Sequence, residues 1–402
     1  MMSKGQQVTI LSLASYHKGT TFLKAAKENG ARVLLLTREK IKDEAWPMDH
    51  IDERYLMPDL SIRPDIFYAV SYLMRADDIA QIVPLDDYDV ETAAALREHL
   101  RLPGLGETAV RFFRDKLAMR QQARAHSIPV PEFTSIFNHD RLRNFMDSVP
   151  PPWVLKPRSE AGAMGIKKVY SPEEVWRRLD ELGDQQSFFH LEQFVSGEVY
   201  HVDSIVWDGE IQFALALYYS KPPMSVAHEG GVFVTRTLPR DSEESRHLTT
   251  LNQRLLQAFQ IPRGVAHTEF IKGEDGQLYF LETAARVGGA NIEQLVEAAS
   301  GINLWAEWAK LEIAFARGEN YQVPEDTGYY AGVLICLARQ EHPDLSDYQD
   351  PEIVRRIDKR HHAGLVVASP QSARVEALIA DYSNRFNQDF LAIAPPLDKP
   401  PS

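Results

Sequence analysis

A loop of small residues beside one lysine is the first segment whose residue types could do chemistry. In WVLKPRSEAGAMGIKKV, residues 153–169, a strand bearing Lys156 is expected to enter the loop and a second strand to leave it. Gly162 and Gly165 permit close backbone approach, so loop N–H groups could face an anion while Lys156 adds positive charge. The loop would suit a triphosphate, and a hairpin with a solvated lysine is the alternative. It is not a P-loop, because Gly-Lys-Ser/Thr opening a helix is absent.

Two glutamates are predicted to face each other across a hairpin. If Asp275-Gly276 is a two-residue turn, Glu269 lies directly opposite Glu282. Facing carboxylates repel unless a cation lies between them, and Mg²⁺ accepts one or two carboxylates with water and phosphate oxygens. A register slip of one residue, which would send one carboxylate to solvent, is the alternative. Strand alternation places on this face His267, Glu269, Ile271, Phe280, Glu282 and Ala284.

An arginine and two glycines follow the second glutamate. Arg286 stands just past the predicted strand, and Gly288-Gly289 precedes a helix expected to start near Asn291. Such an arginine can bridge phosphate oxygens, and the glycines would let a substrate carboxylate approach backbone donors near the helix N-terminus. A surface arginine is the alternative.

The segment HLEQFVSGEVYHVD, residues 190–203, is predicted to form two strands around a Ser-Gly kink. The extended backbone of residues 192–195 could pair with an adenine edge, and Glu198 could accept hydrogen bonds from ribose hydroxyls. A hairpin with exposed glutamates would look the same. His201 and Asp203 alternate onto one face, where we interpret them as a solvated or core pair.

The elements that must position these residues begin with a parallel α/β arrangement. Residues 7–13 and 32–37 are typical of strands and flank a helical pattern over 18–29, and another helix is expected over 89–100. We therefore predict a small Rossmann-like parallel-sheet domain over residues 1–112. The glycine fingerprint of dinucleotide binding is missing after the first strand, which disfavours a nicotinamide cofactor.

The rest of the chain is predicted to be α+β. A helix closed by Pro129 and Pro131 precedes a strand-rich part in which Asp208-Gly209 and Asp275-Gly276 are expected hairpin turns. A further helix is expected near residues 371–387. The expected divisions are a central domain over 113–318, a lid within it over about 131–190, and a C-terminal lobe over 319–402.

Composition bounds the partners and the compartment. The 402 residues are 44% hydrophobic and carry a net charge of −13, so a broad nucleic-acid footprint is disfavoured. No apolar run reaches the ~20 residues of a membrane span. The single cysteine, Cys336, excludes an internal disulfide and is expected to be a buried, inert thiol. A cytoplasmic protein without membrane or nucleic-acid partners is expected.

Taken in order, the motifs resemble those of the ATP-grasp superfamily over most of the chain. They are IVPLDD and LPG, RDK with Lys116, VLKPRSEAGAMG, LEQFVSGE, HTEF and LETAARVGG. The resemblance implies an ATP-grasp fold behind the N-terminal domain. GVAHTEFI followed by ETAARVGGANI is most similar to the L-amino-acid ligases, which are carboxylate–amine ligases.

The resemblance also implies roles for individual residues. Lys116 and Lys156 would contact ATP phosphates, and Glu269 and Glu282 would hold Mg²⁺, with Mn²⁺ as an alternative ion. Arg286 would be the catalytic residue of phosphoryl and acyl-phosphate chemistry. The implied ATP contacts are Lys116, Lys156, Gly162, Gly165, Glu192, Gln193, Phe194, Val195 and Glu198. The implied substrate contacts are His267, Arg286, Gly288 and Gly289.

One departure affects the metal. Two residues after the second acidic ligand the superfamily usually has Asn, and this chain has Ala284. A second Mg²⁺ would therefore lack a side-chain ligand. Lys221, His228 and Arg236 stand where a substrate loop is expected, without naming a substrate.

The sequence thus favours an ATP-dependent ligase that forms an amide or peptide bond from a carboxylate and an amine through an acyl-phosphate. A purine-pathway or carboxylase-type enzyme is an alternative with the same chemistry. A nucleotide-binding regulator without catalysis is an alternative of another class, motivated by Ala284. The resemblance further implies a homodimer formed by the first domain. In the metal-free protein, repulsion between Glu269 and Glu282 is expected to raise the pKa of at least one.

Overall fold

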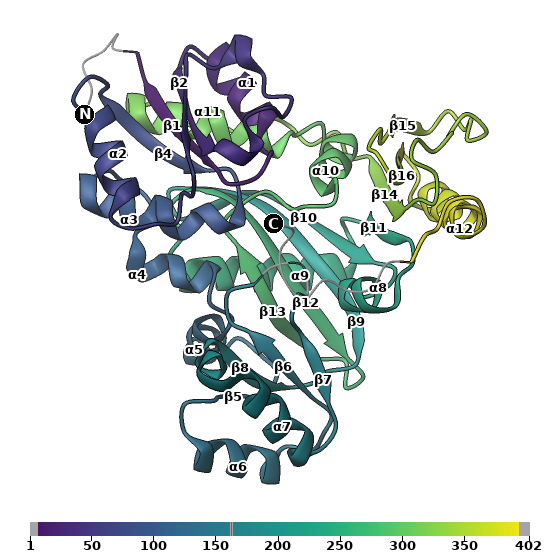
Figure 1. Cartoon of the computed structure of the whole chain (residues 1–402). Coiled ribbons are helices and arrows are strands. Elements are labelled where there is room, and N and C mark those ends of the chain that lie inside the picture. The colour runs from purple at the N-terminus through teal and green to yellow at the C-terminus, as the bar shows by residue number, and fades with distance from the viewer. Residues whose placement is uncertain (1–6, 161, 163, 394–402) are drawn as a thin grey trace.

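The computed structural model describes residues 7–160, 162 and 164–393, and three β-sheets organise it (Figure 1). The N-terminal sheet is parallel with strand order β3-β2-β1-β4, which confirms the predicted fold class of this part. Every residue of β1 is buried, as expected for a parallel strand covered on both faces. The strands are β1 (Thr9–Ala14), β2 (Arg32–Arg38), β3 (Glu53–Met57) and β4 (Ile79–Pro84).

Helices cover this sheet and join it to the rest of the chain. Helix α1 packs on α11, where the Phe22 and Trp308 rings lie 5.7 Å apart edge to face. The N-terminal sheet is therefore held against the central domain by buried apolar side chains. The helices are α1 (Thr20–Glu28), α2 (Asp65–Leu73), α3 (Val90–Leu100), α4 (Glu107–Val110) and α11 (Leu304–Arg317).

A second, antiparallel sheet forms the lower part of the molecule in Figure 1 and carries the lysine loop. Its order is β5-β8-β6-β7, and the fully buried Trp153 lies in its core with side chains of α6 and α7. Ala161 and Ala163 of the loop lie outside the described residues. The elements are β5 (Phe133–Ser135), α6 (His139–Ser148), β6 (Trp153–Pro157), β7 (Lys167–Val169), α7 (Pro172–Leu182) and β8 (Phe189–Gln193).

The third sheet has eight strands in the order β13-β12-β9-β10-β11-β14-β16-β15. Strand β14 pairs with β11, so residues beyond 319 continue the sheet of the central domain. The strands are β9 (Gly197–Trp207), β10 (Glu210–Tyr219), β11 (Phe233–Thr237), β12 (Gly264–Gly273), β13 (Leu278–Ala284), β14 (Tyr330–Leu337), β15 (Ile353–Arg356) and β16 (His362–Ser369). The helices around it are α8 (Pro223–Glu229), α9 (Glu243–Ala258), α10 (Ile292–Ser300) and α12 (Ser372–Asp389).

The two predicted hairpin turns differ in outcome. Asp208 and Gly209 both have positive φ and connect the paired residues Trp207 and Glu210, as predicted. The prediction of the second turn is wrong by one residue, because the Gly273 N–H donates to the Gln277 carbonyl across a three-residue loop. The strands β12 and β13 are therefore offset by one residue next to this loop.

No helix in the described ranges is long and apolar enough to cross a membrane. Cys336 is buried in β14, and burial raises the pKa of its thiol to about 11. The expectation of a buried thiol is therefore confirmed, and the raised pKa disfavours the thiolate form.

Candidate active site

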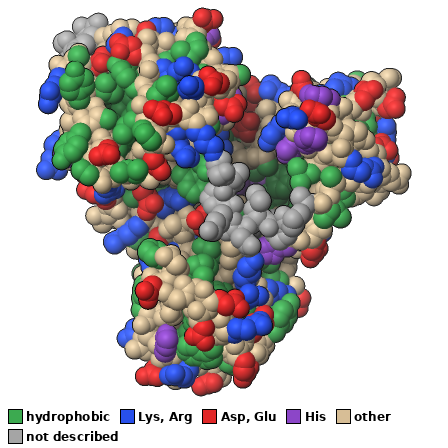
Figure 2. All heavy atoms as spheres, in the orientation of Figure 1, with side chains coloured by type: hydrophobic (Ala, Val, Ile, Leu, Met, Phe, Trp, Pro, Cys, Tyr) green, Lys and Arg blue, Asp and Glu red, His purple; other side chains and the backbone are tan. Residues whose placement is uncertain are grey.

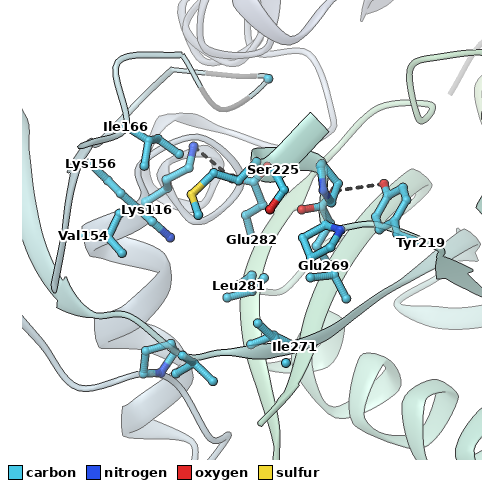
Figure 3. Close-up of a pocket in the computed structure, with 18 of the residues that line it drawn as sticks. Lys116, Val154, Lys156, Ile166, Tyr219, Ser225, Glu269, Ile271, Leu281 and Glu282 are labelled. Carbon is cyan, nitrogen blue, oxygen red and sulfur yellow. Dashed lines mark hydrogen bonds and ion pairs between the residues drawn. The ribbon is translucent and has the colours of Figure 1, made fainter. Parts of the chain in front are cut away.

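A cavity of about 480 Å³ lies between the small antiparallel sheet and the first strands of the large sheet. Figure 3 shows Lys116 and Lys156 on one side of it and Tyr219 and Glu269 on the other, with Glu282 between them. The cavity thus brings together residues that lie up to 170 positions apart in the sequence. The charged residues that line it are Lys116, Lys156, Glu192, His267, Glu269, Glu282 and Arg286.

Lys116 reaches the cavity because a helix begins there. The helix predicted before Pro129 is α5 (Lys116–Ala125), which starts after Asp115, whose side chain caps it by accepting from Leu117 N–H. The Lys116 ammonium donates to the Glu160 carbonyl at 2.5 Å and lies 3.0 Å from Glu282 Oε2. Through these contacts Lys116 connects the start of α5 to the loop after β6 and to β13.

Lys156 belongs to a buried charge cluster on β6 and β8. Its ammonium pairs with Glu192, whose other oxygen lies 3.0 Å from Arg120 Nε and Nη2. Burial would raise the pKa of Glu192, but Arg120 and Lys156 outweigh it and hold that pKa well below its ordinary value. The Glu192 side chain therefore pairs with Lys156 and Arg120, while Glu192 also lines the cavity, and its assignment as an ATP contact through the extended backbone of residues 192–195 stays a prediction.

Replacing Arg120 by methionine is expected to destabilise the fold strongly. Arg120 and Glu192 are almost fully buried, so the change leaves a buried carboxylate without one of its two main cations. We expect the free energy of unfolding to fall by about 3–5 kcal/mol in urea denaturation. The control is Arg124→Met, one turn later on α5, because Arg124 pairs with Glu132 in an exposed ion pair worth about 1 kcal/mol or less. Equally small losses of unfolding free energy in both variants would contradict a stabilising role for the buried charge cluster.

The segment after Glu192 lines the cavity, but Glu198 does not. Gln193, Phe194 and Val195 lie along its wall. The exposed Glu198 lies on the other face of β9 and accepts from Tyr200 at 2.9 Å and from Tyr218 at 3.3 Å. Strand alternation turns the next residue, Val199, into the cavity, so the ribose assignment of Glu198 is wrong.

The two glutamates are cross-strand neighbours, as predicted. Glu269 of β12 pairs with Glu282 of β13, because a β-bulge beyond Glu269 compensates the one-residue error in the turn. The bulge also places Leu281 beside Glu282 in the cavity wall. Phe280 lies instead in the apolar core on the other face, which corrects the predicted set of residues on this face.

Each glutamate has its own cationic or hydrogen-bonding partner, which offsets the expected repulsion between the two carboxylates. Glu282 pairs with Lys116, and Glu269 Oε1 accepts from Tyr219 at 3.0 Å and lies 3.5 Å from His267 Nε2. Burial raises the pKa of Glu269, but His267, His201 and Tyr219 outweigh it, and the net shift is downward. The donor set is two cavity-facing carboxylates, which fits one Mg²⁺.

A buried hydrogen-bonded chain supports Glu269 from behind. Asp203 receives His201 Nδ1 at 2.7 Å and His267 Nδ1 at 3.0 Å, and His201 Nε2 meets the Thr235 hydroxyl at 2.8 Å. The sequence placed His201 and Asp203 on one face but not beside His267. Because His267 is buried and its Nδ1 contacts Asp203, the Nε2 side of the ring is oriented toward Glu269.

The charge of His267 predicts a pH dependence of stability. Burial lowers the pKa of His267, but Asp203 and Glu269 outweigh it and raise the pKa to about 10. A histidine with a raised pKa stabilises the fold fully below its unfolded pKa of about 6.5, and this contribution is lost as pH rises toward 10. Thermal melts should therefore show a larger alkaline fall in Tm for wild type than for His267→Gln, with the exposed His342→Gln as control. Parallel curves for wild type and His267→Gln would exclude the charged histidine.

Arg286 is positioned by the N-terminal domain. Its guanidinium lies 3.6 Å from Asp87, which follows β4 and also lies 3.1 Å from Arg114. Burial raises the pKa of Asp87, but Arg286 and Arg114 outweigh it and lower the pKa. The buried Nε of Arg286 has no hydrogen-bond partner among the described residues, which leaves a donor for a ligand. The motif IVPLDD contained Asp87, but its spacing gave no sign of this contact.

The glycines after Arg286 differ in role. A side chain at Gly288 would meet Asp203 Oδ1 at 2.9 Å and His267 Nδ1 at 3.0 Å, so this glycine is required by packing. Gly289 has open space around it and lines the cavity. Gly162 also lines the cavity, and it shares a positive φ with Gly165.

A second, larger cavity of about 1230 Å³ adjoins the first between the N-terminal domain, α10 and the strands β14–β16. Arg286 and Gly289 line both cavities. Of the three residues expected in a substrate loop, His228 lines the second cavity. Lys221 instead pairs with Glu229 at 3.0 Å, and Arg236 pairs with Glu376 at 3.1 Å.

Comparisons with known proteins agree with this architecture. No family model matches the chain. The L-arginine-specific L-amino acid ligase of Bacillus subtilis is 24% identical over 335 residues, which cover 81% of this chain and 79% of that protein. An L-amino acid ligase from Bacillus licheniformis superposes with a TM-score of 0.75 at 17% identity, covering 97% of this chain and 99% of the other.

A solved structure of an enzyme with a different activity has the same fold. The carboxyaminoimidazole ribonucleotide synthase of Aspergillus clavatus, complexed with ATP, superposes with a TM-score of 0.72 at 14% identity, covering 95% of this chain and 99% of the other. The comparisons confirm the predicted fold class and the resemblance to L-amino-acid ligases.

Proposed function

We propose that this protein is an ATP-dependent carboxylate–amine ligase that acts on amino-acid-like substrates through an acyl-phosphate. The observation that carries the proposal is the position of Arg286 and Gly289 in the walls of both cavities. A nucleotide in the first cavity and a carboxylate in the second would meet at this arginine. The similarity to an L-amino acid ligase over most of the chain supports the same reading.

Each group has a part in the proposed reaction. Lys116 and Lys156 bind nucleotide phosphates, and residues 193–195 line the wall available to adenine. Glu269 and Glu282 would hold Mg²⁺, which neutralises phosphate charge when bound. Arg286 stabilises charge on the transferred phosphoryl group and on the acyl-phosphate. Phosphorylation supplies the leaving group that a carboxylate lacks, so the amine can displace phosphate and form the amide.

The test is a matrix of carboxylates against amines with ATP and Mg²⁺. We expect ADP release above the no-substrate background for a subset of amino-acid pairs, with the amide identified by mass spectrometry. Turnover only with aminoimidazole ribotide and bicarbonate would favour the purine-pathway alternative, which the similarity to a carboxyaminoimidazole ribonucleotide synthase motivates. ATP binding without ADP release in any pair would favour a regulator.

We also propose a homodimer that acts in the cytoplasm. Exposed apolar side chains gather on the N-terminal domain, at the upper left of Figure 2, and include Tyr68 and Tyr72 of α2 and Ile62 before it. A solved biotin carboxylase domain with this fold is described as a dimer. The lone, buried Cys336 fits a reducing compartment.

Sedimentation at micromolar concentration is expected to show a dimer of the 45.6 kDa chain. Replacing Tyr68 and Tyr72 together by glutamate should convert it to monomer, because two buried charges would oppose the contact. A monomeric wild type would exclude the dimer. A dimeric variant would move the contact elsewhere on the surface.

A further inference from the structure

The charged side chains of the second cavity are mostly neutralised by neighbours. Two cations are held by acidic residues of the N-terminal domain that follow β4, and Arg355 of β15 lies 4.0 Å from Glu297. The pairs on the N-terminal side are Lys18 with Asp86, Arg286 with Asp87 and His17 with Glu44. Lys359 also lines this cavity and is a first exception, because no ion pair engages its ammonium group among the described residues.

Glu293 is a second exception. Its partly buried side chain lines the second cavity, and among the described residues no ion pair or side-chain hydrogen bond engages its carboxyl group. It belongs to the first turn of α10, seven positions after Arg286, and the loop between them passes Gly289 at the junction of the two cavities. Figure 1 shows α10 between the N-terminal domain and the strands β14–β16.

The surroundings of Glu293 suit a group that gains and loses a proton. Burial raises its pKa to about 7. The charged groups that act on it are Arg355 of β15, Asp203 of β9 and Glu297 of α10, and the two acids add to the upward shift while Arg355 opposes it. A base is most effective when its pKa lies near the working pH.

Building on the proposed ligase function, we propose that Glu293 binds the ammonium group of the attacking amine and accepts its proton. An ammonium nitrogen has no lone pair, so it cannot attack until one proton leaves to a Glu293 carboxylate oxygen. The nitrogen lone pair then forms the C–N bond with the acyl carbon, and the C–O bond to the phosphate breaks. The phosphate leaves with that electron pair and takes up the surplus proton of the new amide nitrogen.

Charge complementarity supports this role over a structural one. A partly buried carboxylate without a cation costs stability, and an arriving ammonium group supplies the missing charge. The helix N-terminus favours the ionised form of an acid in its first turn, as a base requires. The site therefore suits a cationic amine before proton transfer and a neutral amine after it.

The test separates activation of the carboxylate from attack by the amine. Hydroxylamine is largely neutral at neutral pH and traps an acyl-phosphate as a hydroxamate without a base. Wild type and Glu293→Gln are compared in two assays with the same activated carboxylate: hydroxamate formation and amide formation with an amino-acid amine. Glu297→Gln, one turn later on α10 and outside both cavities, is the control.

We expect Glu293→Gln to lose about 10²–10⁴-fold in amide formation while hydroxamate formation stays near wild type. Glu297→Gln should keep both activities. Equal loss of both products in Glu293→Gln, or loss of neither, would overturn the role of Glu293 while leaving the ligase function in place. If wild type forms no hydroxamate from any carboxylate, the ligase function itself fails and this role with it.

Discussion

Replacing Arg286 by methionine is expected to lower kcat by about 10²–10³-fold, with little loss of stability. The loss follows from removing a preorganised cation that faces the charge developing on the transferred phosphoryl group. The loss of stability should be smaller than for Arg120→Met, because Arg286 lies 3.6 Å from Asp87 without a hydrogen bond, whereas Arg120 is hydrogen-bonded to Glu192, and Asp87 keeps Arg114 at 3.1 Å. Steady-state ADP release and thermal melting of the same protein measure the two effects.

The control for this change is Arg246→Met, which removes an exposed arginine from α9 by the same substitution. It should leave kcat unchanged. Near wild-type turnover of Arg286→Met would remove the arginine from the mechanism. A large fall in Tm would instead show that Arg286 acts mainly by bracing the N-terminal domain through Asp87.

Replacing Glu282 by glutamine is expected to reduce turnover at least 10²-fold and to weaken the coupling between Mg²⁺-ADP and stability. A nucleotide at a hundred times its Kd stabilises a folded protein by about 2.7 kcal/mol, and removing one carboxylate from the metal site should diminish this gain. Without ligand the variant should be only slightly less stable, since the Glu282 side chain is 35% exposed and Lys116 keeps its hydrogen bond to the Glu160 carbonyl.

Melting curves with and without Mg²⁺-ADP measure this coupling. Glu274→Gln in the exposed loop of the same hairpin is the control and should melt like wild type in both states. An undiminished response of Glu282→Gln to Mg²⁺-ADP would show that Glu282 is not a metal ligand. Relief of repulsion between Glu269 and Glu282 should not stabilise this variant, because Lys116 pairs with Glu282 at 3.0 Å.

Local patterns in the sequence predicted much of the fold and part of the site. Apolar periodicity located the β-α-β units of the N-terminal sheet, and the turn residues located both hairpins. The pairing of Glu269 with Glu282 was right because two errors cancelled: the loop is one residue longer than predicted, and a bulge restores the register. A bulge leaves no reliable mark in the sequence, so Phe280 could not be assigned to the correct face.

Contacts between distant segments could not be predicted. Asp87 and Arg286 meet only after the N-terminal sheet docks on the central domain. The buried cluster of Arg120, Lys156 and Glu192 likewise joins a helix to two strands of another sheet. Charge patterns along one chain do not indicate which acidic and basic side chains will pair, so the pairing of Glu192 with Arg120 and Lys156 was not predicted.

The most direct test of the ligase function follows an oxygen atom. An acyl-phosphate forms when a carboxylate oxygen bonds to the γ-phosphorus of ATP, and the amine then displaces phosphate that carries this oxygen. With a substrate labelled with ¹⁸O in its carboxylate, we expect one ¹⁸O atom in each inorganic phosphate released together with the amide. Phosphate released without label, or at the same rate without a carboxylate substrate, would contradict the proposed function.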